Sequence, residues 1–286
     1  MLAEFRADGI TDYLASPLIF TDGAVHVATW STRQPCGFSD AQFAGLQSII
    51  APLARVAEIR ALRRTATNLL DTYVGNHAGE RILAGQIRRG HTETIHAVIW
   101  LSDMRGFTAA ADRLPPQFLL DLLNRYFDCQ VPVIAKHGGQ VLKYIGDGLL
   151  AIFPIAGDGA DPRDVCGRAL ACAREAQEKI HAIGPVVGIE NVEAVRFGLA
   201  LHVGHVLYGN IGSENRLDFT CIGPAVNLAA RLENLASKLG RTIIASAEFA
   251  EHCKLDLEPL GEFAVPGFTA PQATFGLRAE RPPLQG

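Results

Sequence analysis

The sequence has no cysteine pair of the C-x-x-C type, no long apolar run and no excess of basic residues. Its six cysteines are scattered, without histidines nearby at zinc-finger spacing, which argues against a zinc finger or a disulfide framework. We therefore expect reduced thiols. No stretch of about 18 apolar residues free of charge occurs, which argues against a membrane span.

The charge balance and the N-terminus exclude two further classes. Thirty acidic residues against 26 basic ones give a net charge of −4, so no bulk positive field is available to hold nucleic acid, and we expect no nucleic-acid partner. The first residues lack the basic patch and apolar stretch of a secretory signal. We therefore expect a cytoplasmic protein.

What is present suits a globular chain with more than one part. Hydrophobic residues make up 48% and charged residues 20% of 286 residues, enough to bury a core and too apolar for disorder. The length is about twice a typical domain of ~150 residues. We therefore expect one large domain and a smaller piece.

The N-terminal third is predicted to hold a hairpin and a long helix. Residues 17–32 predict two strands around the turn Asp22-Gly23, and Ser39-Asp40 caps the helix that follows. Between about 42 and 73 apolar residues recur three and four apart, with a stammer near residue 59. Two interpretations stay open, an ordinary amphipathic helix and a parallel dimeric signalling helix. We favour the second because the surroundings look regulatory.

From about residue 90 strands and helices interleave. Strands are predicted at 96–103, 194–204, 217–223 and 241–246, a hairpin over 140–153 turning at Asp147-Gly148, and helices near 114–136, 162–183 and 224–239. The hairpins require antiparallel pairing. The predicted fold class is therefore α+β, with a mixed or antiparallel sheet flanked by helices.

Two short segments carry carboxylates at strand ends. In LSDMRGFT, residues 101–108, an apolar strand ends on Asp103 and a glycine opens a helix. A carboxylate at a strand end can bind a hard cation, and exposed amides next to it can bind phosphate oxygens. In KYIGDG, residues 143–148, Asp147 lies at a hairpin tip. Either aspartate alone suits a plain turn or cap. Together, at one sheet edge, they suit a pair of Mg²⁺ ions about 4 Å apart.

A third segment, residues 219–233, places polar side chains on an apolar helix. Pro224 suits the first helical position, and Asn227 and Arg231 then stand four apart on one face. Asparagine is a mediocre residue for a helix interior, so its amide is expected to have a use. A structural pair between Asn227 and Arg231 is the alternative.

In combination these segments resemble the class III nucleotidyl cyclase catalytic domain. The resemblance covers about residues 94–278, with motifs in the order LSDMRGFT, KYIGDGLLAIF, GHVLYGNIGS, FTCIGPAVNLAARLE and LGEFAVPGFTAPQATFGL. It implies the ferredoxin-like, palm-type cyclase fold. It also implies a head-to-tail homodimer with shared active sites that converts ATP to 3′,5′-cyclic AMP and pyrophosphate.

The resemblance further implies a role for each site residue. Asp103 and Asp147, helped by the Met104 carbonyl, would hold two divalent cations, Mg²⁺ or Mn²⁺. The amides of Gly106, Phe107 and Thr108 would bind the triphosphate. From the partner subunit, Asn227 would orient the ribose and Arg231 would neutralise the α-phosphoryl group.

Two positions bear on the base. Lys143 falls on the family's base-reading lysine, which can donate to adenine N1 and would clash with the N1–H of guanine. Thr220 stands where adenylyl cyclases commonly have aspartate, which resembles the threonine-type subclass that includes bicarbonate-stimulated enzymes. We therefore favour adenylyl over guanylyl cyclase and expect bicarbonate as a possible regulator.

The remaining parts are assigned more coarsely. The first ~60 residues resemble part of a GAF domain, which gives segments at 1–45 (GAF-like), 46–90 (signalling or dimerisation helix and linker), 91–279 (catalytic domain) and 280–286 (tail). Two rivals stay open: a catalytically silent cyclase-like module, and a diguanylate cyclase or polymerase-like palm enzyme. The second lacks its G-G-D-E-F type signature, because the hairpin reads IGDGLLAIF.

Overall fold

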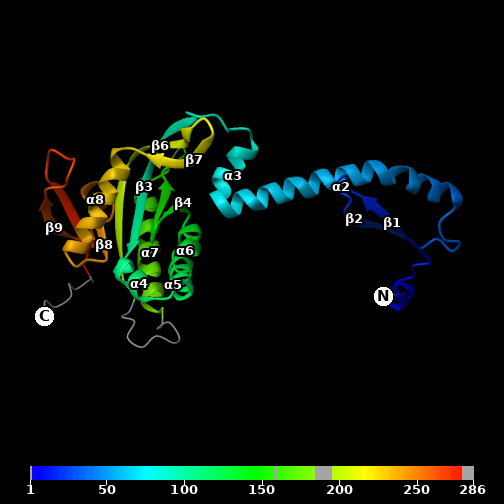
Figure 1. Ribbon diagram of the computed structural model, residues 1–286, viewed down its shortest axis with the longest axis horizontal. Coiled ribbons are helices and arrows are strands. Elements are labelled where there is room, and N and C mark those ends of the chain that lie inside the picture. Colours follow the sequence, from blue (N-terminus) through cyan, green and yellow to red (C-terminus); the bar gives the residue numbers. More distant parts are fainter. Residues whose placement is uncertain (1, 158–159, 184–194, 279–286) are drawn as a thin grey trace. The chain divides into compact units, whose positions relative to one another are not determined.

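The computed structural model describes residues 2–157, 160–183 and 195–278. Its contacts divide the chain into two compact units, Met1–Thr72 and Tyr73–Gly286 (Figure 1). Residues 73–90, expected in the linker, thus make their contacts within the second unit. Within the described ranges no helix is long and apolar enough to cross a membrane. The expected tail at 280–286 lies outside the described residues.

The first unit contains a hairpin and most of a long helix. After α1 (Leu2–Ala7), strands β1 (Asp12–Ile19) and β2 (Val25–Thr32) pair antiparallel around the predicted turn, and α2 (Asp40–Val74) follows. The hairpin is confirmed, but its first strand begins earlier than residue 17. In the observed register Ile19 pairs with Val25 and Asp12 pairs with Thr32, so the last residues of β2 pair with residues that precede residue 17.

The start of α2 is fixed by a reciprocal cap. The Ser39 amide donates to Gln42 Oε1 at 2.9 Å, and the Gln42 amide donates to Ser39 Oγ at 3.3 Å. This arrangement satisfies two backbone donors that a helix end leaves free. From there α2 continues through Pro52, so the predicted helix over about 42–73 is confirmed.

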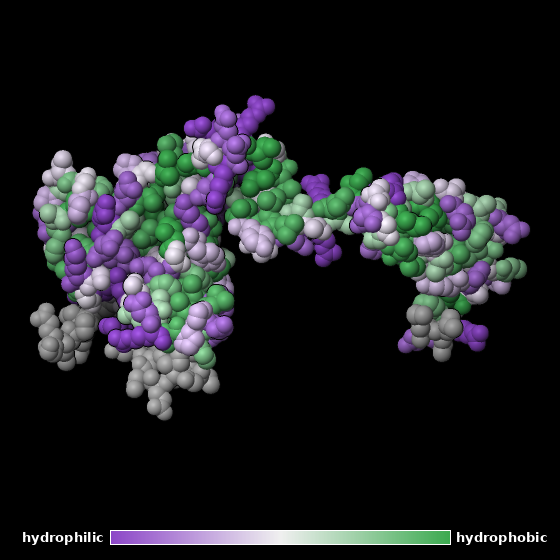
Figure 2. Space-filling model, in the orientation of Figure 1, coloured by the Kyte–Doolittle hydropathy of each residue, from purple (hydrophilic) through white to green (hydrophobic). Residues whose placement is uncertain are grey.

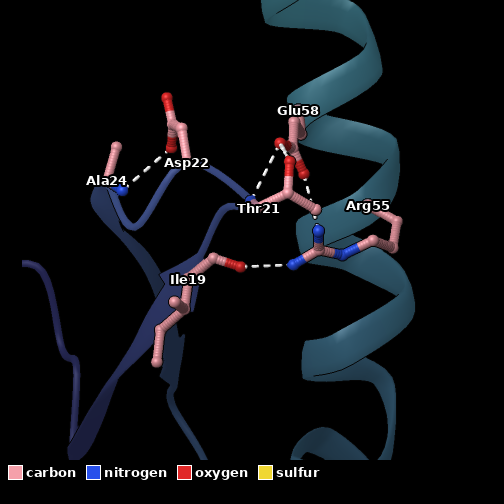
Figure 3. A network of polar contacts seen from close by, with 6 residues as sticks. All are labelled: Ile19, Thr21, Asp22, Ala24, Arg55 and Glu58. Carbon is pink, nitrogen blue, oxygen red and sulfur yellow. Dashed lines mark hydrogen bonds and ion pairs between the residues drawn. The ribbon is translucent and has the colours of Figure 1, made fainter.

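A polar network fastens the hairpin to α2 (Figure 3). Buried Glu58 accepts from the Thr21 amide at 2.9 Å and from the Thr21 hydroxyl, and its other oxygen lies 2.7 Å from Arg55 Nη1. Arg55 Nη2 donates to the carbonyl of Ile19 at 2.5 Å. The end of β1 and the first residue of the turn are therefore held by one face of the helix.

The second unit is built on one mixed sheet. Its strands are β3 (Thr92–Met104), β4 (Gln140–Ile145), β5 (Gly148–Pro154), β6 (Phe197–Ser213), β7 (Arg216–Ile222), β8 (Ile243–Ser246), β9 (Leu257–Phe263) and β10 (Gln272–Leu277). The order is β4-β5-β3-β6-β8-β10-β9, and β7 pairs with β6. Strands β6 and β8 run parallel and the other neighbours antiparallel. The predicted fold class is confirmed.

Helices cover both faces of this sheet (Figure 1). They are α3 (Asn76–Leu83), α4 (Phe107–Arg113), α5 (Pro116–Asp128), α6 (Val131–Lys136), α7 (Pro162–His181), α8 (Pro224–Lys238) and α9 (Ala247–Ala250). Apolar residues of α5, α6, α7 and α9 share one core with alternate strand residues such as Trp100 and Phe153. Those of α3 and α8 pack on the opposite face, against residues such as Ile99 and Leu150. Successive side chains of a strand point to opposite faces of the sheet, so neighbouring residues such as Ile99 and Trp100 belong to different cores.

Two local predictions were wrong. The helix expected over 114–136 is broken into α5 and α6, because Pro132 has no N–H to continue the backbone ladder. The hairpin expected to turn at Asp147-Gly148 turns at Gly146-Asp147, because Gly148 already pairs with Ile145 as the first residue of β5. Gly146 takes φ 64°, where glycine has no steric penalty. The helix expected to open at a glycine after Asp103 is confirmed as α4, with Gly106 as its N-cap, whereas the short helix α9 was not predicted.

Candidate active site

Two carboxylates meet at the edge where β3 ends and β4 turns into β5. Ser102 pairs with Leu149, so the end of β3 lies directly beside the hairpin tip. Asp103 and Asp147 are both half-buried there. A side chain at Gly148 would approach Asp103 Oδ1 to 3.1 Å and the Ser102 carbonyl to 2.9 Å, so glycine at this position leaves the carboxylate its room.

The environment of Asp103 disfavours its negative charge. Burial is the largest cause and the Asp147 carboxylate the next, and together they raise the pKa of Asp103 to about 6. Glu233 also raises this pKa, whereas the Arg105 guanidinium lowers it. Cations that bind between two half-buried carboxylates reduce the electrostatic repulsion between them.

The donor set fits divalent cations. Asp103 and Asp147 supply hard carboxylate oxygens, and the Met104 carbonyl is the next backbone oxygen along the strand. Among the described residues no group of three histidine, cysteine or acidic side chains is placed to hold a metal by itself. Two carboxylates therefore leave coordination positions for other oxygens, as Mg²⁺ commonly uses with phosphates and water.

The residues predicted to bind phosphate directly follow the end of β3, where Asp103 lies. Gly106 has φ 77°, with nothing within 4 Å of the position of a Cβ, and caps α4, which begins at Phe107. The Phe107 ring packs against the core, while Thr108 is exposed. Apart from Asp147, the predicted metal and phosphate residues thus lie in one continuous segment, residues 103–108, at the sheet edge.

Strand β7 brings a residue to Lys143 that the sequence interpretation missed. Lys143 Nζ, on β4, donates to Asp218 Oδ2 at 3.0 Å. Thr220 lies two residues further along β7, on the same side of the strand. Its Oγ1 is buried and has no hydrogen-bond partner among the described residues. The only signal for Asp218 in the sequence was its spacing from Thr220.

Asn227 and Arg231 lie apart from these residues, on the exposed face of α8. Within the part of the chain that the structure describes, neither side chain makes a hydrogen bond or ion pair, with the other or with any residue. The alternative of a structural Asn227–Arg231 pair is therefore not observed. Arg231 opens onto a groove lined by Asn234, Lys238 and Pro266, among others.

A buried ion pair joins α8 to the end of β3, and sequence reasoning did not find it. Arg105 Nη1 lies 2.8 Å from Glu233 Oε1, and Arg105 Nη2 donates to the Glu233 carbonyl at 3.3 Å. The two residues are far apart in sequence, so only the packing of α8 on the sheet brings them together.

Comparisons with known proteins give a matching family model and related sequences. The family model of the adenylate and guanylate cyclase catalytic domain matches residues 91–279. Adenylate cyclase 1 of Rhizobium meliloti is 28% identical over 164 residues, which are 56% of this chain and 24% of that protein. The chain spans about a quarter to a third of the length of the curated relatives it matches.

Solved structures similar to this chain include cyclases for both bases. The guanylyl cyclase Cya2 is 28% identical with a TM-score of 0.56, covering 68% of this chain and 97% of that one. The adenylyl cyclase CyaB from P. aeruginosa is 26% identical with a TM-score of 0.55, covering 68% of this chain and all of that one. Overall similarity therefore does not separate the two substrates.

Proposed function

Because the chain belongs to the family of adenylate and guanylate cyclase catalytic domains, we propose that it converts ATP to 3′,5′-cyclic AMP and pyrophosphate. The active sites would be shared between the two subunits of a homodimer. The observation that carries the proposal is the half-buried pair Asp103 and Asp147 beside the segment from Met104 to Thr108.

The acidic end of the site would hold the cations. Asp103, Asp147 and the Met104 carbonyl would bind two divalent ions, Mg²⁺ or Mn²⁺. When bound, such ions lower the pKa of the ribose 3′-hydroxyl and neutralise charge on the phosphates. The chain itself contributes the amides of Gly106, Phe107 and Thr108, which donate to triphosphate oxygens.

The face of α8 would complete the site of the partner subunit. Asn227 would hold the ribose so that its 3′-oxygen faces the α-phosphorus, in line with the bond to pyrophosphate. Arg231 would donate to the α-phosphoryl oxygens as their charge grows, which a fixed guanidinium does well. The exposure of both side chains and their lack of partners within the described chain support a role across an interface.

The base pocket supports ATP as the substrate. The ion pair with Asp218 orients Lys143, whose ammonium can donate to adenine N1. The buried Thr220 hydroxyl, without a partner in the described chain, can accept from the adenine N6 amino group. The 28% identity with the guanylyl cyclase Cya2 keeps GTP as the second candidate.

We also propose a subunit contact along α2, within a signalling or dimerisation segment at residues 46–90. Residues 1–45 would be a GAF-like piece before it, and the catalytic domain would follow at 91–279. Apolar side chains of α2 reach the surface of the molecule (Figure 2), among them Ile59, Leu62, Leu69 and Tyr73, with 65%, 64%, 55% and 82% of their area exposed. A second copy of the helix would cover this stripe.

Product analysis tests the function directly. The purified protein is incubated with Mn²⁺ and either ATP or GTP, and the products are identified by mass. We expect cyclic AMP and pyrophosphate from ATP, with a higher kcat/KM than for GTP. Preferential cyclic GMP formation would establish the guanylyl alternative, nucleotide binding without product would indicate a silent module, and a cyclic dinucleotide would indicate the diguanylate cyclase.

A further inference from the structure

Arg105 lies between the residues proposed to bind cations and those proposed to bind phosphate. Asp103 and Met104 precede it and Gly106 follows it, so every neighbour has a proposed role with cations or phosphate. Its amide donates to the carbonyl of Arg196 at 2.8 Å, which fixes its backbone to the neighbouring segment. The side chain is 20% exposed, so its positive charge is largely withdrawn from water beside the two carboxylates.

Contacts with Glu233 orient the Arg105 side chain toward α8. The Glu233 carboxylate, 5% exposed, forms an ion pair with Arg105, with Oε1 2.8 Å from Nη1, and the Glu233 backbone carbonyl accepts a hydrogen bond from Arg105 Nη2. Room for the pair comes from Gly198, which lies opposite Asp103 in the β3–β6 register. A Cβ at Gly198 would collide with Arg105 Nη2 and with Glu233 Oε1. Strands β3 and β6 and helix α8 therefore jointly enclose one ion pair.

A buried ion pair is a weak means of stabilisation, since the cost of removing two charges from water offsets most of their attraction. Its location suggests a different benefit. The Arg105 guanidinium packs against Gly198, the residue that pairs with Asp103 across the β3–β6 register, and its charge opposes the rise in the pKa of the Asp103 carboxyl. A guanidinium without Glu233 would find in Asp103 and Asp147 a carboxylate pair that it can bind in bidentate fashion.

We propose that Glu233 is a positioning residue that holds the Arg105 guanidinium away from Asp103 and Asp147, and so keeps both carboxylates available to divalent cations. The inference rests on the proposed cyclase function and adds a requirement to it. Helix α8 would then serve two active sites. Glu233 would act on the carboxylate pair of its own subunit, and Asn227 and Arg231 would act on the substrate bound to the partner subunit.

The test measures binding, independent of turnover. The probe is Mn²⁺ with 3′-deoxy-ATP, which lacks the attacking hydroxyl and cannot be cyclised, titrated calorimetrically into the full chain. Glu233→Gln should weaken binding by about tenfold or more, because the released guanidinium competes with the cations. In the double variant Arg105→Gln/Glu233→Gln the affinity for the probe should recover to within about threefold of wild type, because no guanidinium remains to compete with Mn²⁺ for the carboxylates.

A matched control removes a different ion pair. Glu175 on α7 accepts from Lys136 Nζ at 2.8 Å and contacts His137 Nε2 at 3.0 Å, away from the carboxylate pair. Glu175→Gln should bind the probe as wild type does. If Glu233→Gln does not fold, as judged by thermal unfolding, Glu233→Asp keeps the charge on a shorter side chain. That variant should bind more weakly than wild type and should recover when Arg105→Gln is added.

The outcomes separate this inference from the function on which it rests. Equal binding by wild type and the Glu233 variant would overturn the inference alone, and so would a double variant that binds no better than the single one, since the pair would then be a structural brace. Wild-type protein that neither binds the probe nor forms a cyclic nucleotide would overturn the proposed function itself.

Discussion

Single side chains in this site act through the charges that surround them. Asp103 is the clearest case, because burial and Asp147 raise its pKa to about 6 while Arg105 opposes them. The same carboxylate in water would keep the ordinary pKa of aspartate, about 4, with no second carboxylate beside it. The acidic pair is therefore held in a state that a divalent cation relieves, and this makes its removal a decisive experiment.

Asp103→Ala and Asp147→Ala should each abolish turnover with the fold intact. We expect a loss of at least about a hundredfold in kcat/KM, because removing residues that merely support metal ligands already costs roughly 10–100-fold. Initial rates with Mn²⁺ and ATP, beside circular dichroism spectra, provide the check. Activity within about tenfold of wild type in either variant would contradict the metal assignment.

Lys143→Ala should lower kcat/KM for ATP more than Thr220→Ala does. A hydrogen bond from a charged donor is about twice as strong as a neutral one, and the lysine also rejects guanine. Rates with ATP and GTP are compared for both variants and wild type. A larger loss in the Thr220 variant would show that the hydroxyl, not the ammonium, reads the base.

Bicarbonate should raise kcat at constant pH, since Thr220 in place of a carboxylate removes one fixed negative charge from the pocket and lowers the electrostatic cost of a nearby anion. The assay holds pH and ionic strength fixed with chloride as the control. A flat response up to tens of millimolar, roughly the range that fills sites of millimolar Kd, would reject the regulation and leave the cyclase proposal standing.

At the scale of whole elements, the helices differ in what covers them. Helix α8 buries Leu228 and Leu232 against the sheet and leaves its polar face exposed. Helix α2 leaves large apolar side chains exposed along most of its length. An apolar stripe of this kind is costly in water, so a partner of the same chemistry would stabilise it.

Leu62→Lys should weaken the dimer by about tenfold or more, because it places a charge within an apolar helix contact. The dissociation constant is measured by sedimentation equilibrium of the full chain. Asn68→Lys is the matched control, an exposed position on the same helix outside the stripe. An equal effect of both substitutions would mean that α2 does not form the contact and only responds to added charge.

At the scale of the whole molecule, the proposed site is divided between two sets of residues. The carboxylate pair, Lys143 and Thr220 lie on strands and a hairpin turn, and residues 106–108 lie at the start of α4. Asn227 and Arg231 lie on α8, without contacts to these residues in the described chain. A head-to-tail homodimer would bring each set to the complementary set of the partner, and would create two equivalent sites.

Mixing Asp103→Ala with Arg231→Ala chains should therefore restore activity, because one site of each heterodimer is then intact. Random association makes about half of the dimers mixed, each with one of two sites active, so about a quarter of wild-type activity is expected. Asp103→Ala mixed with Asp147→Ala is the control, since both lesions affect the same set of residues. No recovery in demonstrated heterodimers of the first pair would refute the shared site.

The sequence by itself determined the parts that depend on local order. Short apolar segments bounded by turn residues predicted the strands of an α+β sheet, and Pro224 marked the start of α8. The order of the motifs identified the cyclase resemblance. The spacing also placed Asp103 at a strand end and Asp147 in a hairpin turn. These features follow from neighbours within a few residues, which periodicity and turn chemistry describe well.

Only the tertiary structure decided which distant residues touch. Asp218 reaches Lys143 because β7 folds back along β6. Glu233 reaches Arg105 because α8 packs over the strand where Gly198 leaves a gap. The register of paired strands and the packing of a helix on a sheet are set by the whole core, and no local pattern encodes them.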